Sequence, residues 1–434
     1  MNVVFVLSDY VLHNRIVADY VAARPEDRVA IVKVPLVLKG KGRLDTALRI
    51  APAYSGPVVH VQDASRAVGI TRALLDPAQR EGFVAGVRAE YEEIRRERGE
   101  RRSADVRLSL ADARANRLRV DWTDVLPPRP SFLGVRTFRA YPLTELVERI
   151  DWGPFFAAWE LRGSYPSILD DPSVGAAARD LHRDALALLD QLVAGGRLRA
   201  DAVVGFWPAN AVGDDIVAWR DPGRTEALAT FRTLRQQMAK RDARPNLALA
   251  DFVAPRETGV EDFVGAFAVT AGHGLEEIVA DFEAAHDDYA AILAKALADR
   301  LAEAFAERLH ERVRRELWGY APGEALSNAD LLAERYQGIR PAPGYPACPD
   351  HSEKETLFAL LEAEERAGIR LTESWAMLPG ASVSGYYFWH PQSAYFGVGR
   401  IGRDQLEDYA RRTGIPVAEA VRILRPNLAD DALA

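Results

Sequence analysis

Cysteine is almost absent from this sequence, and its scarcity excludes several classes of site. The 434 residues include one cysteine, Cys348, and eight scattered histidines. One thiol can form no internal disulfide, and zinc fingers, zinc deaminases and iron–sulfur proteins need several cysteines or closely spaced histidines. The sequence therefore predicts a cytoplasmic protein without a metal site of its own.

Long apolar runs and an excess of positive charge are also missing. No apolar stretch reaches the roughly 18 residues of a membrane span, and residues 1–10 lack the basic region and cleavage site of a secretory signal. The chain has 55 lysines and arginines against 63 aspartates and glutamates, a net charge of −8. Without a bulk positive field we expect no nucleic-acid partner and no membrane partner.

The composition that remains is that of a folded protein, 48% hydrophobic and 27% charged. Its length is typical of two or three domains.

Short β-branched runs at 3–7, 29–38 and 57–62 predict buried strands of an α/β layer. The glycines at 40 and 42 fit neither a dinucleotide fingerprint nor a Walker loop, which favours an ordinary loop there. Residues 76–102 predict a helix that ends in a charge cluster, RRERGERR, at a domain boundary.

Residues 276–318 have the clearest periodicity, which predicts one long helix or two in series. Apolar residues recur there mostly every four positions, at Phe282, Tyr289, Leu293, Leu297, Leu301, Phe305, Leu309, Val313 and Leu317. Glu303 shares a different face with Asp299 and Glu307, since positions four apart lie on one side of a helix. By residue type alone, these three predict a solvated acidic face.

The last third of the chain begins with a rigid loop at 339–354, where four prolines and a glycine exclude a helix or a central strand. We expect a helix at 353–367, a β-meander with aromatic faces at 372–402, and C-terminal helices at 403–413 and 416–424.

Two side chains in this part could act chemically, but each also has a structural interpretation. Cys348, near His351, is either a thiol nucleophile or a small buried residue in a proline-rich loop. His390 is either a ligand or a structural histidine at the end of a strand. The structural interpretation is favoured for both.

Arg340 begins the rigid loop, where its planar guanidinium could bind a carboxylate through two parallel hydrogen bonds. After it come small Ala342, then Gly344, which allows close approach, and Tyr345 with a flat ring and a hydroxyl. Such a loop suits a zwitterionic ligand with an aromatic base. Asp151, before a turn that contains a proline, is a second candidate. An ion pair for Arg340 and a helix cap for Asp151 remain open as alternatives.

Several long motifs resemble the C-terminal activation domain of cobalamin-dependent methionine synthase. They are RPAPGYPACPDH at 340–351, ESWAMLPGASVSG at 373–385, YFWHP at 387–391, DQLEDYA at 404–410, FLGVRTF at 132–138, IDW at 150–152 and VGFWPAN at 204–210. The resemblance covers about residues 103–425.

This resemblance implies that the chain binds S-adenosylmethionine and supports reductive methylation of cob(II)alamin on a methionine synthase, with a flavodoxin-like electron donor. The family's ligand contacts correspond here to Asp151, Glu303, Arg340, Ala342, Tyr345 and Tyr395. Arg340 would pair with the methionyl carboxylate, and the two acids would offset the ligand's positive charges or accept ribose hydroxyls. Asp299 corresponds to a family position near the displaced cobalt-ligating histidine. The alternative is a module that binds S-adenosylmethionine, or docks a partner, without methyl transfer.

Residues 43–102 resemble the C-terminal edge of the family's cobalamin-binding domain, but the axial-histidine motif D-x-H-x-x-G is missing. We therefore expect cobalamin on a partner domain or protein, and no methionine synthesis by this chain alone, because the family's zinc and folate modules are missing too. The predicted fold class is α+β, with a meandering antiparallel sheet and long helices, preceded by a partial α/β segment. The predicted domains are 1–102, of which 1–42 resemble nothing in the family, and 103–434.

Overall fold

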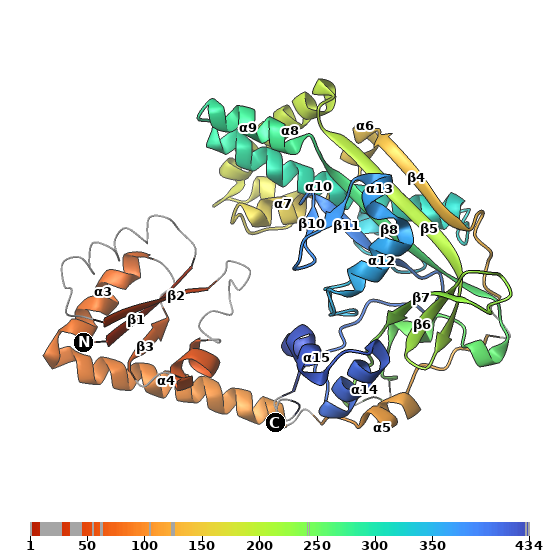
Figure 1. Ribbon diagram of the computed structural model, residues 1–434. Helices are drawn as coiled ribbons and strands as arrows, with labels where there is room; N and C mark the ends of the chain where they lie inside the picture. Colours follow the sequence, from red (N-terminus) through yellow and green to blue (C-terminus); the bar gives the residue numbers. More distant parts are fainter. Residues whose placement is uncertain are drawn as a thin grey trace. The chain divides into compact units, whose positions relative to one another are not determined.

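The chain forms two compact units, Met1–Val106 and Arg107–Ala434, in the computed structural model (Figure 1). The structure describes residues 2–8, 28–34, 46–53, 56–60, 64–103, 106–122, 126–240, 242, 244–429 and 432. In the sequence, the boundary between the units falls four residues after the division at 102 that we expect from the charge cluster.

Unit 1 contains a small parallel sheet with helices. The strands β1 (Asn2–Ser8), β2 (Arg28–Val34) and β3 (Val58–His60) lie in the order β2-β1-β3. They confirm the three predicted strands, while the glycines at 40 and 42 lie outside the described residues. The helices α3 (Ala64–Leu75) and α4 (Pro77–Ser103) follow, and α4 confirms the helix expected at 76–102. A small core of Val59 and Leu74 joins β3 to α3.

Unit 2 is built on a six-stranded antiparallel sheet. Its strands are β4 (Gly134–Tyr141), β5 (Arg199–Val212), β6 (Asp215–Trp219), β7 (Ala227–Arg232), β8 (Asp262–His273) and β11 (Ser382–Tyr387). The order is β11-β8-β5-β6-β7, and β4 also pairs with β5. The long β5 pairs with β8 over most of its length, and β4 and β6 pair with successive parts of it. This arrangement confirms the α+β fold class.

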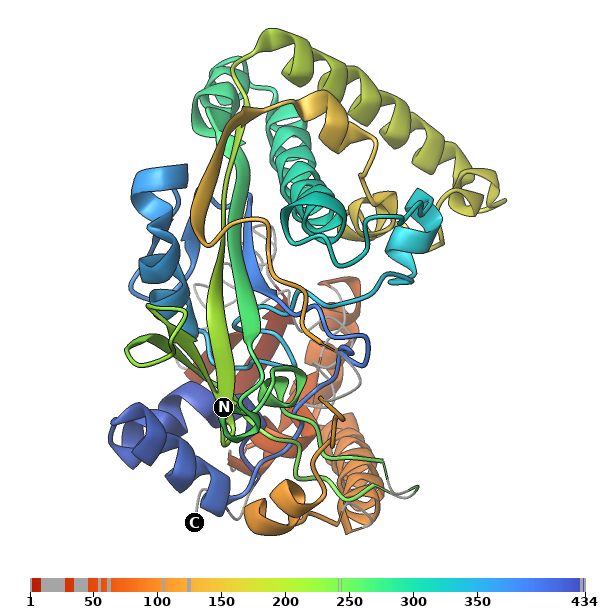
Figure 2. The same ribbon diagram turned by 90° about the vertical axis from the view of Figure 1, so that its right-hand side faces the viewer.

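Both faces of this sheet are covered, because alternate residues of β5 enter two different cores (Figure 2). Ala202 and Val204 pack in the core that contains α10. Val203 and Trp207 pack in the core that contains α12 and α13. A strand between two helical layers needs apolar residues on both sides, which explains its continuous apolar run.

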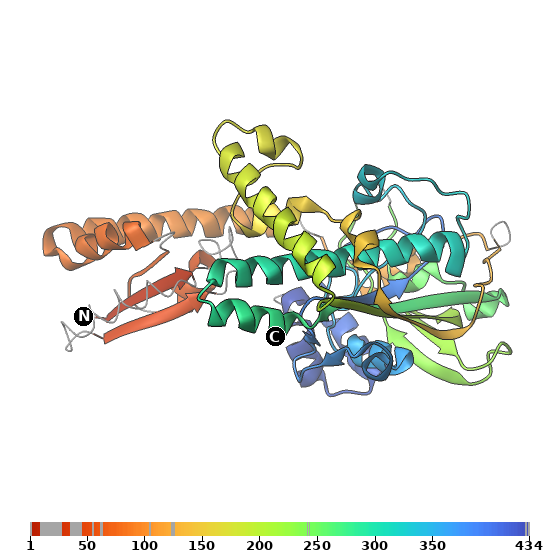
Figure 3. The ribbon, with the colours of Figure 1, turned by 90° about the horizontal axis from the view of Figure 1, so that it is seen from above.

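The first face carries the helices α6 (Leu143–Val147), α7 (Trp152–Ala158), α8 (Gly175–Gly195), α9 (Leu275–Ala284) and α10 (Asp288–Arg312). Figure 3 shows α9 and α10 side by side as a hairpin. A π-helical turn, Val313–Leu317, continues α10. The predicted stripe is buried at Leu293, Leu297, Leu301, Phe305, Leu309, Val313 and Leu317. Tyr289 differs, because it lies in the first turn of α10 and is exposed.

The second face carries α12 (Glu353–Leu361) and α13 (Ala363–Ala367). The single helix expected at 353–367 is wrong in one respect, because Glu362 adopts a left-handed conformation and divides it. The helices α14 (Arg403–Thr413) and α15 (Val417–Leu424) confirm the two predicted C-terminal helices and form a third core around Leu406 and Tyr409. The shorter helices are α5 (Leu110–Ala115) and α11 (Asn328–Leu332).

The β-meander expected at 372–402 is largely wrong. Its first part contains β10 (Met377–Leu378), which pairs only with β9 (Arg370–Leu371), and its middle forms β11. Residues 388–402 form no further strand, although Phe388 pairs with Ile339. The aromatic residues favour a strand there, but Pro391 lacks a backbone donor, and Gly399 has φ of +73°.

Among the described residues, no helix has the length and apolar composition needed to cross a membrane.

Candidate functional site

The loop that carries Arg340, Ala342 and Tyr345 runs beside the end of β11. Ile339 and Phe388 exchange backbone hydrogen bonds of 2.9 and 3.0 Å, and the amide of Tyr386 donates to the carbonyl of Pro341 at 2.9 Å. Gly385 permits this approach, because a Cβ at that position would lie 2.7 Å from the Pro341 oxygen. The sheet edge thus fixes the backbone at Arg340.

The next part of the loop is a tight turn that displays Tyr345. The amide of Tyr345 donates to Ala342 at 3.2 Å, and the amide of Gly344 donates to Cys348 at 2.7 Å. Gly344 has φ of +92°, and a Cβ there would lie 2.2 Å from the His351 ring. Glycine is therefore required by both conformation and space. The side chain of Tyr345 is 59% exposed.

The guanidinium of Arg340 is held by three partners. Its Nη2 lies 2.7 Å from Oε2 of Glu307, and its Nη1 donates to the hydroxyl of Tyr336 at 2.8 Å and to Nδ1 of His310 at 3.2 Å. Burial alone would lower the pKa of Arg340, but the charge of Glu307 outweighs it and the pKa is raised. The arginine is therefore a permanent cation with a fixed orientation.

His310 is neutral in this cluster. Burial, followed by the charges of Arg314 and Arg340, lowers its pKa well below the ordinary value. An arginine can only donate, so Nδ1 accepts from Arg340 and the ring proton belongs on Nε2. Nε2 lies 3.3 Å from the hydroxyl of Tyr320, which accepts that proton's hydrogen bond.

Tyr395 is brought to Arg340 from a distant part of the chain. Its hydroxyl accepts a 3.0 Å hydrogen bond from the backbone amide of Arg340 and lies 3.4 Å from the hydroxyl of Tyr336. Glu303 is exposed on α10, one turn before Glu307. Burial, together with the charge of Glu303, raises the pKa of Tyr345, so these two side chains are close enough to interact. Four predicted site residues are thus linked in two pairs, Arg340 with Tyr395 and Glu303 with Tyr345.

Asp151 has the role of a helix cap. It is the N-cap of α7, and its Oδ1 accepts a 2.9 Å hydrogen bond from the amide of Gly153. Helix α7 packs against α10, which carries Glu303. Within the described residues, no hydrogen bond or ion pair joins Asp151 to the other five predicted site residues. The structural alternatives for Asp151 and Arg340 are thus both observed, and the cap and the ion pair leave part of each side chain accessible.

Two comparisons with known proteins bear on this arrangement. Residues 142–414 match the family described as vitamin B12 dependent methionine synthase, activation domain. A crystal structure of the MetH reactivation domain bound to AdoHcy is 54% identical, with a TM-score of 0.73, over 75% of this chain and 99% of that chain. The chain belongs to the family of methionine synthase activation domains. The family resemblance read from the sequence is therefore confirmed.

Sequence reasoning missed three residues that shape the candidate site of this activation domain: Glu307, His310 and Tyr336. The prediction of a solvated acidic face is wrong for Glu307. Its side chain is only 9% exposed and pairs with Arg340. Asp299 and Glu303 are exposed, as expected. The four-residue spacing correctly indicated that Glu303 and Glu307 share one face of α10. It could not show that the loop with Arg340 covers this face at Glu307, one turn after Glu303.

The two other reactive side chains of the activation domain are buried. Burial, and then the charges of Glu353 and Asp350, raises the pKa of Cys348 well above its usual range, so the thiol is not a ready nucleophile. Burial lowers the pKa of His390 to about 4, and its Nδ1 accepts from the amide of Gln392 at 3.1 Å. Both observations agree with the structural interpretations.

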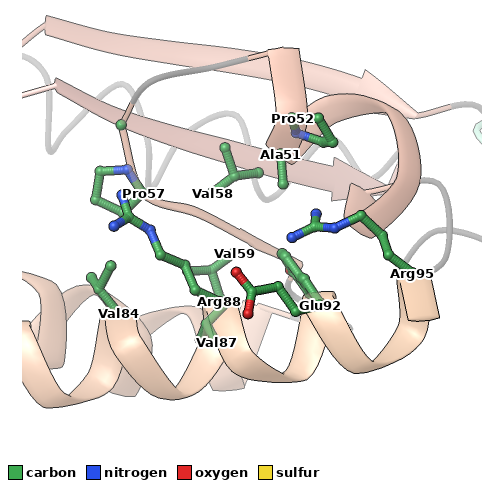
Figure 4. A pocket seen from close by; sticks show the side chains of 12 residues that line it. Ala51, Pro52, Pro57, Val58, Val59, Val84, Val87, Arg88, Glu92 and Arg95 are labelled. Carbon is green, nitrogen blue, oxygen red and sulfur yellow. The ribbon is translucent and has the colours of Figure 1, made fainter. Parts of the chain in front are cut away.

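Unit 1 has a hollow of its own, of about 420 Å³, between α4 and the segment that leads into β3 (Figure 4). Val58, Val59 and Val87 are among its apolar lining residues, and Arg88, Glu92 and Arg95 contribute charges. No predicted site residue lies there. The residues of unit 1 also lie outside the part that matches the family, so the resemblance of 43–102 to a cobalamin-binding domain stays a prediction.

Proposed function

We propose that this activation domain binds S-adenosylmethionine and supports reductive methylation of cob(II)alamin held by a partner domain or protein of methionine synthase. The observation that carries the proposal is the 54% identical reactivation domain bound to AdoHcy, the demethylated form of that ligand. The partner's cobalamin would accept the methyl group after a one-electron reduction by a flavodoxin-like donor. A cytoplasmic location, favoured by the single cysteine, stays a prediction.

The proposed ligand contacts are Asp151, Glu303, Arg340, Ala342, Tyr345 and Tyr395. Arg340 is suited to the methionyl carboxylate, because its Nη1 and Nη2 already have partners that fix the plane of the group. In the described part of the chain no hydrogen bond uses its Nε–H, and the side chain is 22% exposed. One edge of the guanidinium is therefore available for a carboxylate.

The other proposed contacts match the rest of the ligand in chemistry. Glu303 and Asp151 carry negative charge, which would offset the sulfonium and ammonium groups or accept ribose hydroxyls. Ala342 leaves space beside the loop, and the exposed ring of Tyr345 offers a flat surface to the adenine. The hydroxyl of Tyr395 fixes the backbone of Arg340. The chain's part in the reaction is to bind and orient the methyl donor.

Isothermal titration calorimetry with S-adenosylmethionine tests this site. We expect saturable binding to the wild-type chain and at least about tenfold weaker binding to Arg340→Ala, since a charge-assisted pair is lost. The matched control is Arg366→Ala, which removes an arginine from an exposed pair with Glu362 on α13 and should leave binding unchanged. Absence of saturable binding, or equal binding by Arg340→Ala, would overturn the proposal.

A further inference from the structure

Helix α10 and its π-helical turn carry four polar side chains at helical spacing. Glu303, Glu307, His310 and Arg314 follow one another at intervals of four, three and four residues, so they lie on one face of the helix. Glu303 is exposed, whereas the other three are buried. Helix α10 packs against β11, where Tyr387 stacks on the ring of His310. The buried part of this face is therefore a polar layer behind the candidate site.

The charges in this layer cancel. Arg314 is fully buried and makes 2.9 and 2.7 Å hydrogen bonds to Glu324. Its Nη1 lies 3.9 Å from Oε1 of Glu307, whose Oε2 pairs with Arg340. Glu307 thus lies between two guanidinium groups, with neutral His310 beside them. With the two partners Arg340 and Glu324 counted in the layer, its two arginines and two glutamates leave no net charge.

The groups outside the layer then determine the electrostatic field at the candidate site. Asp151 and Glu303 are two of the proposed contacts, and Asp299 precedes Glu303 by one turn of α10. Arg300 contributes one opposing charge. Glu307 already pairs with Arg340, and the three acids and one arginine outside the layer then carry a net charge of −2.

We infer that Glu307 determines ligand specificity, because by cancelling the charge of Arg340 it makes the site prefer a cationic sulfonium ligand to the neutral thioether. This inference rests on the proposed function. S-adenosylmethionine and S-adenosylhomocysteine share their adenosine, carboxylate and ammonium groups, and they differ by one methyl group and one positive charge. A pocket with a negative field therefore retains the methyl donor more strongly than the product of methyl transfer.

The test is the ratio of the two dissociation constants, measured by calorimetry on the full chain. Glu307→Gln keeps a hydrogen-bond acceptor for Arg340 but adds one net positive charge to the layer. We expect the preference for S-adenosylmethionine over S-adenosylhomocysteine to fall by about fivefold, whatever happens to the individual affinities. Glu307→Asp keeps the charge, so its ratio should equal that of the wild type.

The matched control is Glu311→Gln, one turn further along α10. Glu311 is as buried as Glu307, with a side chain 9% exposed, but it pairs with Arg149 and Arg308 instead of Arg340. Loss of the Glu311 charge should lower stability and leave the ratio of dissociation constants within about twofold of the wild type.

If Glu307→Gln does not fold, Glu324→Gln is the second variant. It adds the same charge to the layer without touching Arg340, and we expect a smaller shift of the ratio in the same direction.

The outcomes separate the two proposals. If the wild type binds neither ligand, the proposed function fails. If both ligands bind and Glu307→Gln leaves the ratio unchanged, or if Glu307→Asp shifts it equally, Glu307 has only a structural role and the inference is wrong. An unchanged ratio in Glu324→Gln would contradict it in the same way.

Discussion

Glu353, at the start of α12, is a buried acid near Cys348 of the loop that carries Arg340. The residue is only 6% exposed. Burial, together with the charge of Asp350, raises its pKa to about 8, although Arg232 opposes the shift. The side chain is therefore mainly protonated in the folded protein near neutral pH, whereas it ionises near pH 4.5 once the chain unfolds.

The sign of the resulting pH dependence follows from this difference. Between pH 4.5 and about 8 the folded state holds a proton that the unfolded state has lost. The contribution of Glu353 to stability is thus complete below pH 4.5 and is lost as pH rises through this window. As pH rises from 4.5 to about 8, we expect the free energy of unfolding of Glu353→Gln to increase relative to that of the wild type by about 5 kcal/mol.

Urea unfolding at several pH values checks this prediction. Exposed Glu364→Gln, on α13, is the control and should show a difference from the wild type that does not vary with pH. If the difference for Glu353→Gln is also constant with pH, Glu353 is not the proton-binding group described here.

At the scale of elements, α10 is the main support of unit 2, and its apolar stripe can be tested at Phe305. This side chain is fully buried and its ring lies 4.7 Å from that of Tyr141. We expect Phe305→Ala to lower the free energy of unfolding by about 3–5 kcal/mol, because it leaves a cavity. On the same helix, Ile292→Ala removes a side chain that is 55% exposed and should cost less than about 0.5 kcal/mol. Similar losses at the two positions in urea unfolding would contradict this account of the core.

The regular elements were predictable from local patterns. The four-residue recurrence of Leu297, Leu301 and Phe305 determines which face of α10 is buried, whatever packs on it. The presence of a loop at Arg340 was equally predictable, because its prolines and glycine exclude a helix or a central strand. The aromatic residues after Tyr387 were misleading, because a strand also needs an edge to pair with. In the described part of the chain, residues 388–402 make only two isolated pairings, Phe388 with Ile339 and Ile401 with Leu428.

The candidate site was predictable only in part, since its members come from separate elements. Arg340 and Tyr345 lie in one loop, and motif resemblance added Tyr395, which the fold brings to the amide of Arg340. The pairing of Glu307 with Arg340 depends on how the loop crosses α10. Such a contact joins residues 33 positions apart, and no short-range pattern encodes it.

At the scale of the whole molecule, the two units make a direct prediction about fragments. All six proposed contacts lie in Arg107–Ala434, which has its own sheet and cores. We expect a fragment of residues 107–434 to fold cooperatively, with a dissociation constant for S-adenosylmethionine within about twofold of the full chain. Thermal unfolding and calorimetry of both proteins check this. A fragment that aggregates or binds much more weakly would show that unit 1 supports the site.

The most direct test of the account is transfer of the labelled methyl group of S-adenosylmethionine to cobalamin. The assay contains the full chain, a cobalamin-binding protein of methionine synthase in the cob(II)alamin form, and reduced flavodoxin. The account predicts label on cobalamin that depends on the chain and on the electron donor and is lost with Arg340→Ala. Normal binding of S-adenosylmethionine without any transfer of label would contradict it.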